Sequence, residues 1–121
     1  MALQGLDHVT VNCADLARSR AFYADVLGME DGQRPPFPFP GAWLYLGGRP
    51  VVHLVGDAMS GTGTGSLDHV AFAAQDFVGV KSRFEGLAIP FGENLVPGAR
   101  VRQLFVHDPD GLKIELNFRG D

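Results

Sequence analysis

The four residues Leu67–Val70 (LDHV) repeat the earlier stretch Leu6–Val9 letter for letter. Their histidines, His8 and His69, are 61 residues apart (69 − 8). A repeat at a fixed spacing is typical of a duplicated structural unit. The sequence therefore predicts two copies of one supersecondary unit, facing each other across a pseudo-two-fold axis.

A second repeated pattern lies at nearly the same spacing. Val52–Leu54 and Ile114–Leu116 both read apolar, polar, leucine, and their central residues, His53 and Glu115, are 62 residues apart (115 − 53). The two patterns together place four side chains at equivalent points of the two copies. All four are residue types that bind metal ions.

Length and composition are those of one ordinary globular domain. The chain has 121 residues, 45% of them hydrophobic and 20% charged, which is enough for a hydrophobic core. A net charge of −4 without any basic run argues against nucleic acid as a partner, and no apolar stretch approaches the roughly 20 residues of a membrane span. Met1–Gly5 lacks the pattern of a signal peptide. Cys13 is the only cysteine, so we expect a reducing, cytoplasmic location and no disulfide within the chain.

The first half of the chain predicts one helix among several strands. Asp15 is a suitable N-cap, apolar residues follow at helical spacing, and Gly28 stands where a left-handed residue ends a helix. The four prolines of Arg34–Gly41 exclude regular structure in that segment. The expected strands are Leu6–Cys13, Met29–Gln33, Trp43–Leu46 and Val51–Val55. The last two form a hairpin with a Gly-Gly-Arg-Pro loop, longer than a minimal turn.

The second half predicts the same order of elements. Asp76 is expected to cap a second helix, Gly92–Ala99 is expected to be a loop, and His107–Gly111 (HDPDG) is a turn sequence. The expected strands are Leu67–Ala73, Ile89–Phe91, Arg100–Val106 and Leu112–Phe118. The order is therefore β-α-β-β-β twice, which is an α+β fold. We expect a single domain, 1–121, with a first module at about 4–56, a Gly/Thr/Ser-rich linker at about 57–66 and a second module at about 67–119.

The candidate site consists of the four repeat-equivalent residues His8, His53, His69 and Glu115. Each is flanked by apolar or strand-forming residues, so we expect all four in mid-strand, facing one cavity. A buried carboxylate is costly unless it is paired or bound to a metal. Three imidazoles and one carboxylate suit a divalent ion such as Zn, Ni, Fe, Mn or Co. Without His53, the other three would form a two-histidine, one-carboxylate triad.

Structural roles compete with these assignments. A single strand histidine is more often a structural residue than a ligand, and Glu115 on an edge strand would face solvent. His107 adjoins the Asp-Pro-Asp-Gly turn and is expected at the surface or rim. Cys13 has no special partner in the sequence and is expected to be a small buried residue rather than a nucleophile.

Four further side chains are candidates for contact with a substrate. Trp43 and Tyr45 share a face of the predicted hairpin, where they either line the cavity or pack in the core. Phe39 lies on the proline-rich loop, which is either a lid over a pocket or a plug against the body of the protein. Arg102 is a candidate for neutralising an anionic substrate.

These residues lie in stretches that resemble the vicinal oxygen chelate superfamily, which includes glyoxalase I, bleomycin-resistance proteins, fosfomycin-resistance enzymes and extradiol dioxygenases. The matching stretches span nearly the whole chain: Leu6–Val11, Ala21–Met29, Leu67–Phe72 and Phe105–Leu116 (FVHDPDGLKIEL). The resemblance implies two βαβββ modules, each curling into half of a barrel-like cavity. It also implies metal ligands on the first and fourth strands of each module, which here are His8, His53, His69 and Glu115.

The implied function is a metal-dependent, glyoxalase-like enzyme of the lyase or isomerase type. The metal would chelate two adjacent oxygens of a small substrate, and Glu115 would move a proton. Glyoxalase I typically carries a carboxylate where His53 stands, so this sequence departs from that pattern. Two alternatives stay open: a small-molecule-binding dimer of the antibiotic-resistance type, and a small ring-cleaving dioxygenase. Small members of the superfamily are typically homodimers, often with the site shared between chains.

Overall fold

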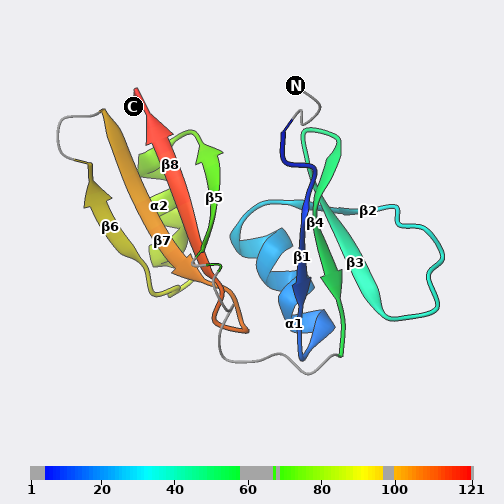
Figure 1. Cartoon of the computed structure of the whole chain (residues 1–121). Coiled ribbons are helices and arrows are strands. Elements are labelled where there is room, and N and C mark those ends of the chain that lie inside the picture. Colours follow the sequence, from blue (N-terminus) through cyan, green and yellow to red (C-terminus); the bar gives the residue numbers. More distant parts are fainter. Residues whose placement is uncertain (1–4, 58–66, 68, 97–99, 121) are drawn as a thin grey trace. The chain divides into compact units, whose positions relative to one another are not determined.

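A computed structural model describes residues 5–57, 67, 69–96 and 100–120 of the chain (Figure 1). Its contacts divide the chain into two compact units, Met1–Ser60 and Gly61–Asp121. Most of the linker expected at 57–66 lies outside the described residues. The organisation of both units into one domain around a shared cavity stays a prediction.

Each unit has the predicted β-α-β-β-β order. The first unit contains β1 (Val9–Asn12), α1 (Leu16–Ala21), the π-helical turn η1 (Phe22–Val26), β2 (Glu30–Gly32), β3 (Gly41–Leu46) and β4 (Arg49–Val55). The second unit contains β5 (His69–Ala74), α2 (Phe77–Gly86), β6 (Gly92–Leu95), β7 (Val101–His107) and β8 (Lys113–Arg119).

The two units have the same sheet topology. The first sheet has the strand order β1-β4-β3-β2 and the second has β5-β8-β7-β6. In both sheets the first and last strands of the unit run parallel and the other neighbouring pairs are antiparallel. The α+β fold with two βαβββ modules is therefore confirmed.

The strand registers confirm the repeat at single-residue resolution. Thr10 pairs with His53 across the parallel β1–β4 ladder, and Ala71 pairs with Glu115 across β5–β8. Residues 10 and 71 are separated by the same 61 positions as the two LDHV histidines. His53 and Glu115 therefore occupy equivalent sites in the two sheets.

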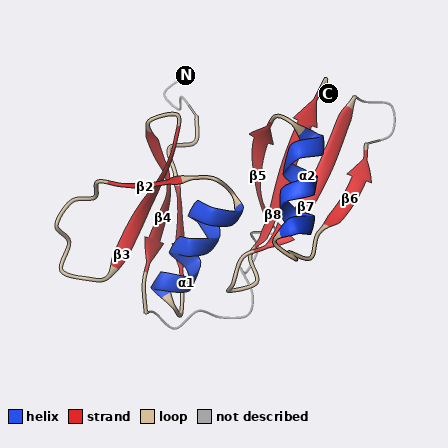
Figure 2. Ribbon diagram, turned by 180° about the vertical axis from the view of Figure 1, so that it is seen from behind, coloured by secondary structure: helices blue, strands red, loops and turns tan. Residues whose placement is uncertain are grey.

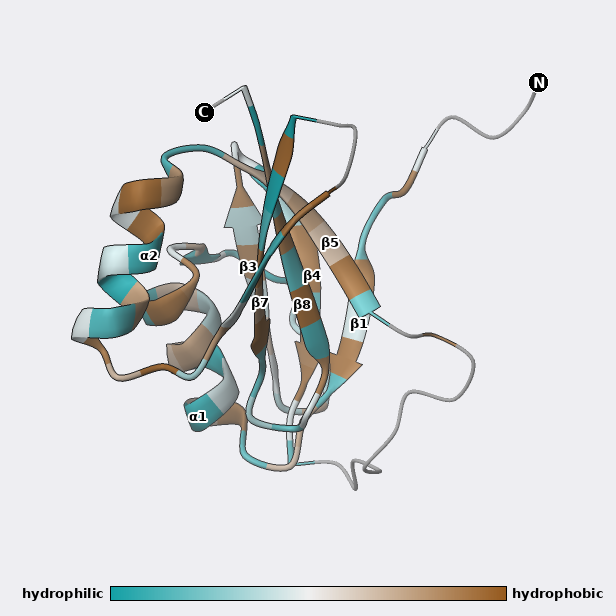
Figure 3. Cartoon of the chain, turned by 90° about the vertical axis from the view of Figure 1, so that its left-hand side faces the viewer, coloured by the Kyte–Doolittle hydropathy of each residue, from teal (hydrophilic) through white to brown (hydrophobic). Residues whose placement is uncertain are grey.

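Each sheet buries one face against the helix of its own unit (Figure 2). Side chains alternate between the faces of a strand, and the hydropathy colouring of β8 alternates accordingly (Figure 3). The buried side chains of the first unit are mainly Val11, Phe22, Tyr23, Ala42, Leu44, Val52 and Leu54. Those of the second unit are mainly Phe77, Phe84, Leu104, Val106, Ile114, Leu116 and Phe118. The helix-covered faces are thus the two hydrophobic cores.

Both predicted helix caps are present. The Asp15 carboxylate accepts a hydrogen bond from the backbone N–H of Arg18 at 3.1 Å, and the Asp76 carboxylate accepts one from Gly79 at 3.1 Å. These bonds satisfy backbone donors that the first turn of a helix leaves unpaired. Gly28 has a φ of +74°, as expected for a residue that follows the end of a helix.

Two loop predictions are wrong. The β3–β4 hairpin has a minimal two-residue turn, because Gly47 and Gly48 have φ of +56° and +78° and the next two residues already belong to β4. The strand expected at Ile89–Phe91 is absent, and β6 (Gly92–Leu95), which lies in the segment expected to be a loop, pairs with β7 in its place. Pro90 explains the shift, since it has no N–H to donate to a ladder.

The strand positions of two predicted ligands also need correction. His8 immediately precedes β1 and His69 is the first residue of β5, whereas His53 and Glu115 are in mid-strand as predicted. The β1–β4 ladder begins where Val9 pairs with Val52. Beyond that point β4 contains Pro50, which has no N–H with which to extend the ladder. None of the helices among the described residues has the length and apolar character needed to cross a membrane.

Candidate functional site

The predicted ligands of both sheets belong to the face that carries no helix. Along β4, Val52 and Leu54 are buried in the core, whereas His53 between them is half-buried. Glu115 on β8 has the same environment, with buried neighbours on both sides. We call this the open face of each sheet; the opposite face packs against the helix.

In the first unit, three aromatic rings stack on the open face. The imidazole centroids of His8 and His53 are 3.8 Å apart at an interplanar angle of 15°, and the Trp43 ring lies 3.9 Å from His53 at 8°. Register explains the second contact, since Trp43 of β3 pairs directly with His53 of β4. The His53 imidazole is therefore held between two flat rings.

Hydrogen bonds define which nitrogen of each imidazole is engaged. Nδ1 of His8 lies 2.7 Å from the Asp7 carboxylate, and Nε2 of His53 lies 2.9 Å from the carbonyl oxygen of Pro50. A carboxylate and a carbonyl only accept hydrogen bonds, so both of these nitrogens carry the proton. The lone pair available to a ligand is then on Nε2 of His8 and on Nδ1 of His53.

Two ionisable groups of this cluster have shifted pKa values. The hydrogen bond and the charge of His8 lower the pKa of the Asp7 carboxyl below its ordinary value of 3.8. Burial, with the nearby His8 as a second cause, lowers the pKa of His53 below 6.5. Neutral His53 is thereby favoured, which is the form that binds a metal ion.

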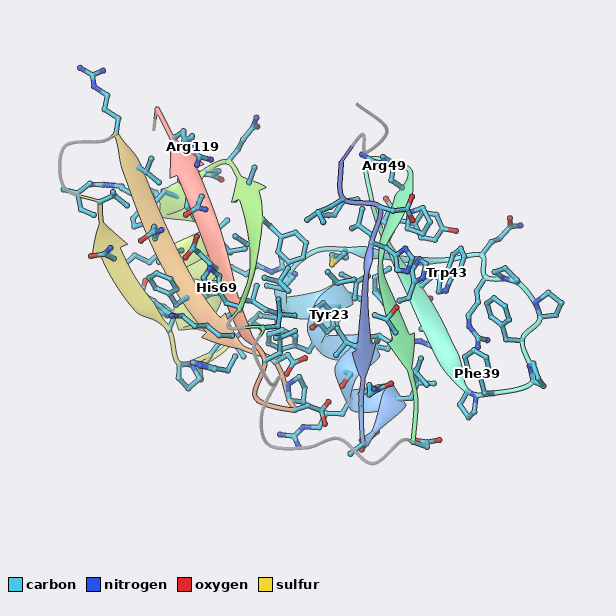
Figure 4. All side chains as sticks on the ribbon, viewed as in Figure 1. Tyr23, Phe39, Trp43, Arg49, His69 and Arg119 are labelled. Carbon is cyan, nitrogen blue, oxygen red and sulfur yellow. The ribbon has the colours of Figure 1, made fainter. Side chains whose placement is uncertain are left out.

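In the second unit, the two predicted ligands also lie side by side. Nε2 of His69 is 3.6 Å from Oε1 of Glu115, a distance for an ion pair rather than a hydrogen bond. The Glu115 side chain is only 14% exposed and that of His69 is 36% exposed. Figure 4 shows His69 at the start of β5.

A row of side-chain amides leads across the open face to Glu115. Nδ2 of Asn94 donates to Oε1 of Gln103 at 2.9 Å, and Nε2 of Gln103 donates to Oδ1 of Asn117 at 3.0 Å. Nδ2 of Asn117 then donates to Oε2 of Glu115 at 2.8 Å. We call Asn94, Gln103 and Asn117 the amide relay. The sequence alone does not reveal it, because only the strand register brings the three residues together.

The predicted substrate-contact residues of the first unit have different environments. Phe39 stacks on Phe37 at 5.2 Å, and the Arg34 guanidinium lies about 5 Å from both rings (5.2 and 5.0 Å). Trp43 lies 6.4 Å from Phe37, so these aromatic rings continue the imidazole row toward the proline-rich loop (Figure 4). The Tyr45 hydroxyl donates to the carbonyl oxygen of Gln33, which ties it to the end of β2.

Arg102 does not join Glu115 on the open face. It pairs with Phe118 across β7–β8, on the helix side of the sheet, and its guanidinium lies 4.7 Å from the Phe77 ring of α2. The residues beside it on β7, not Arg102, face the site, because neighbouring side chains of a strand point to opposite faces. This placement argues against the predicted contact between Arg102 and a substrate.

The two residues expected to lie outside the site do so. Cys13 is fully buried and its Sγ donates to the carbonyl oxygen of Val55 at 3.3 Å. His107 is exposed at the end of β7.

The predicted ligands form one pair in each unit. Among the residues that the structure describes, no three His, Cys, Asp or Glu side chains gather closely enough to hold a metal ion. The donor chemistry of the pairs nevertheless suits a divalent transition metal: two imidazoles in one, an imidazole and a carboxylate in the other. The lone pairs of stacked imidazoles lie in nearly parallel planes, here with ring centroids 3.8 Å apart, so binding one ion through His8 and His53 requires the rings to tilt.

Comparison with known proteins gives the family. The model of the Glyoxalase/Bleomycin resistance protein/Dioxygenase superfamily matches residues 5–116. A protein of Arabidopsis thaliana named Glyoxylase I 4 is 35% identical over 123 residues, which cover 94% of this chain and 70% of the relative.

Solved structures give the same fold. A glyoxalase family protein from Bacillus anthracis aligns with a TM-score of 0.80 at 24% identity, covering 98% of both chains. The lactoylglutathione lyase of Agrobacterium tumefaciens aligns with a TM-score of 0.73 at 20% identity, covering 98% of this chain and 96% of the other. With a family model that spans most of its length and a relative 35% identical, this chain belongs to the Glyoxalase/Bleomycin resistance protein/Dioxygenase superfamily.

Proposed function

We propose that the protein is a metal-dependent, glyoxalase-like enzyme of the lyase or isomerase type, which acts on a small substrate with two adjacent oxygen atoms. The observation that carries the proposal is the pairing of the four repeat-equivalent residues. His8 lies against His53, and His69 against Glu115, on the open faces of two sheets with identical topology. A structural role would not require metal-binding residue types at all four of these positions.

The proposed ligands are His8, His53, His69 and Glu115. When bound, a divalent ion supplies Lewis acidity to the two adjacent oxygens of the substrate. Glu115 is the only carboxylate of the set, so we assign it the transfer of a proton. Oε1 is the proposed reacting atom, because Oε2 accepts a hydrogen bond from Asn117. Trp43 and Phe39 are proposed to contact the substrate and to exclude water from it.

The names of similar proteins support this class of chemistry. The Arabidopsis relative is named as a glyoxalase I, and one solved structure of the same fold is a lactoylglutathione lyase. Because glyoxalase I typically carries a carboxylate in place of His53, the proposal does not extend to the glutathione adduct of methylglyoxal. The substrate class is a small compound with vicinal oxygens.

A second candidate function is the capture of a planar small molecule without chemistry. It is favoured by the exposure of Phe37 and Phe39, which are 41% and 42% accessible although they stack on each other beside Trp43. Such a protein would retain ligand affinity after His8→Ala and Glu115→Ala and would lose it after Trp43→Ala.

The proposal is tested by a substrate screen on protein loaded with zinc, nickel, cobalt, manganese or iron. The panel contains 2-oxoaldehydes, with and without thiol adducts, and α-hydroxy ketones. We expect turnover with at least one metal, and loss of that turnover in Glu115→Gln, a variant of the same size without the basic oxygen. Affinity for a panel compound without metal, unchanged in Glu115→Gln, would instead support the binding function.

A further inference from the structure

The two oxygens of the Glu115 carboxylate have different partners, and only one of them accepts a hydrogen bond. Oε2 accepts the hydrogen bond of Asn117 at 2.8 Å, while Oε1 lies 3.6 Å from Nε2 of His69. The side chain is 14% exposed, so water has limited access to it. One oxygen is therefore engaged by the protein and the other faces the second predicted ligand of the unit.

The Glu115 carboxylate determines which group donates and which accepts in every hydrogen bond of the amide relay. An ionised carboxylate only accepts, so Asn117 must present its NH₂ group to Glu115 and its carbonyl oxygen to Gln103. Gln103 must then donate to Asn117 and accept from Asn94. Turning any one amide over would place donor against donor or acceptor against acceptor at the next contact, so the relay resists reorientation as a whole.

Among the described residues of the first unit, the relay has no counterpart. By register, Asn117 and Gln103 correspond to Val55 and Gly41, because Gln103 pairs with Asn117 and Gly41 pairs with Val55. Neither Val55 nor Gly41 has a polar side chain. In the first unit the equivalent ligand, His53, is instead held by Trp43 and the carbonyl of Pro50. The relay is thus found in the unit whose ligand is a carboxylate, and it is not a shared feature of the two repeats.

We propose that Asn117 and Gln103 are positioning residues, which fix the Glu115 carboxylate so that Oε1, the oxygen that faces His69, is the one that binds a metal ion or takes a proton. The catalytic consequence of this positioning rests on the proposed function. Asn117 acts directly on Glu115, Gln103 acts through Asn117, and Asn94 closes the row at the exposed edge strand β6. Hydrogen-bond partners of metal ligands commonly tune affinity about 10–100-fold.

The first test is made on metal-free protein, by NMR of the side-chain amides. Replacing Glu115 by Gln should shift the NH₂ signals of Asn117 and, through it, those of Gln103. Asn12 is the matched control, since it is an exposed asparagine on the open face of β1 and pairs with Val55; its signals should not move. Unchanged signals of both Asn117 and Gln103 would overturn the relay.

The second test measures zinc affinity by competition with a chromophoric chelator, and the visible spectrum of the cobalt-loaded protein. We expect a loss of about 10–100-fold in affinity for Asn117→Ala and a smaller loss for Gln103→Ala, together with an altered cobalt spectrum. Asn12→Ala should match the wild type. A purely structural role would lower the melting temperature and leave affinity and spectrum unchanged, which would overturn the positioning role.

The two proposals fail in different ways. A wild-type protein that binds no metal ion contradicts the proposed function, and the NMR result then decides alone whether the relay holds Glu115. A wild-type protein that binds metal while Asn117→Ala and Gln103→Ala bind it equally well contradicts only the positioning role.

Discussion

At the scale of single residues, the equivalent residues His53 and Glu115 are held by two different kinds of interaction. His53 is flat and aromatic, and the Trp43 ring stacks on it at 3.9 Å. Glu115 is charged, and the Asn117 amide donates to it at 2.8 Å. Each interaction suits the side chain that it holds, because stacking orients a ring whereas a charge-assisted hydrogen bond orients a carboxylate.

The stacking makes Trp43 a reporter of the proposed site. It is the only tryptophan of the chain, and metal binding by His8 and His53 requires their rings to tilt out of the stack. We therefore expect its fluorescence to change on titration of metal-free protein with zinc. His53→Ala should abolish the change, and a zinc response that survives in this variant would show that His53 is not a ligand.

The pKa of His53 predicts a pH dependence of stability in the metal-free protein. Because burial lowers this pKa below 6.5 in the folded state, the unfolded chain binds more protons near that pH. The free energy of unfolding should therefore decrease as the pH falls through about 6.5, until His53 is protonated in both states.

The measurement is chemical denaturation between about pH 8 and pH 5. His53→Gln, which keeps a polar side chain but does not titrate, should show a shallower decrease than the wild type. Equal slopes for the two proteins would contradict the assignment of this effect to His53.

At the scale of elements, the turn between β7 and β8 fixes the register that positions Glu115. Asp108 is 4% exposed, and its Oδ1 accepts hydrogen bonds from the backbone N–H of Asp110 at 2.9 Å and of Leu112 at 2.8 Å. Gly111 supplies a φ of +89°, which strains residues with a Cβ. The turn sequence is thus a structural device and not part of the chemistry.

We expect Asp108→Ala to lower the free energy of unfolding by about 2 kcal/mol, because it leaves buried backbone donors unpaired. Gly111→Ala should cost about 1 kcal/mol, since its φ stays positive. Thermal or urea denaturation measures both. A stable Asp108→Ala protein that has lost metal affinity would contradict the structural role and make Asp108 part of the site.

Local signals were sufficient to predict most elements. Asp15 and Asp76 cap their helices as expected, and the repeat predicts the shared topology. The two-residue turn at Gly47 and Gly48 was missed, because the composition of a loop does not say which of its residues adopt a positive φ. The π-helical turn η1 also went unpredicted, since its bonds extend a helix whose apolar spacing looks ordinary.

The sequence predicts the four candidate ligands of the site but not the side chains that hold them in place. The repeat identifies His8, His53, His69 and Glu115 from the sequence alone, because it depends only on residue type and spacing. The relay and the Trp43 stack depend on which residues pair across strands, and that is a property of the register. For Arg102, the charge suggests contact with a ligand, whereas the alternation of side chains along β7 places it on the helix side of the sheet.

At the scale of the whole molecule, we expect a homodimer. Small members of the superfamily are typically homodimers, often with the site shared between chains. In the part of the chain that the structure describes, the open faces carry half-buried polar and aromatic residues that the helix of their own unit does not cover. Light scattering on the purified protein should give a mass near twice 13.0 kDa. A monomer that retains full metal affinity would contradict this expectation.

The proposed metal site is tested most directly by measuring the amount of transition metal bound per chain, in protein purified without a histidine tag. The wild type is compared with His8→Ala, His53→Ala and Glu115→Ala, with Asn12→Ala as the control. We expect a near-stoichiometric divalent ion in the wild type and the control, and its loss in the other three variants. A wild-type protein that holds no metal after metal-replete purification would contradict the enzyme proposal and favour the binding function.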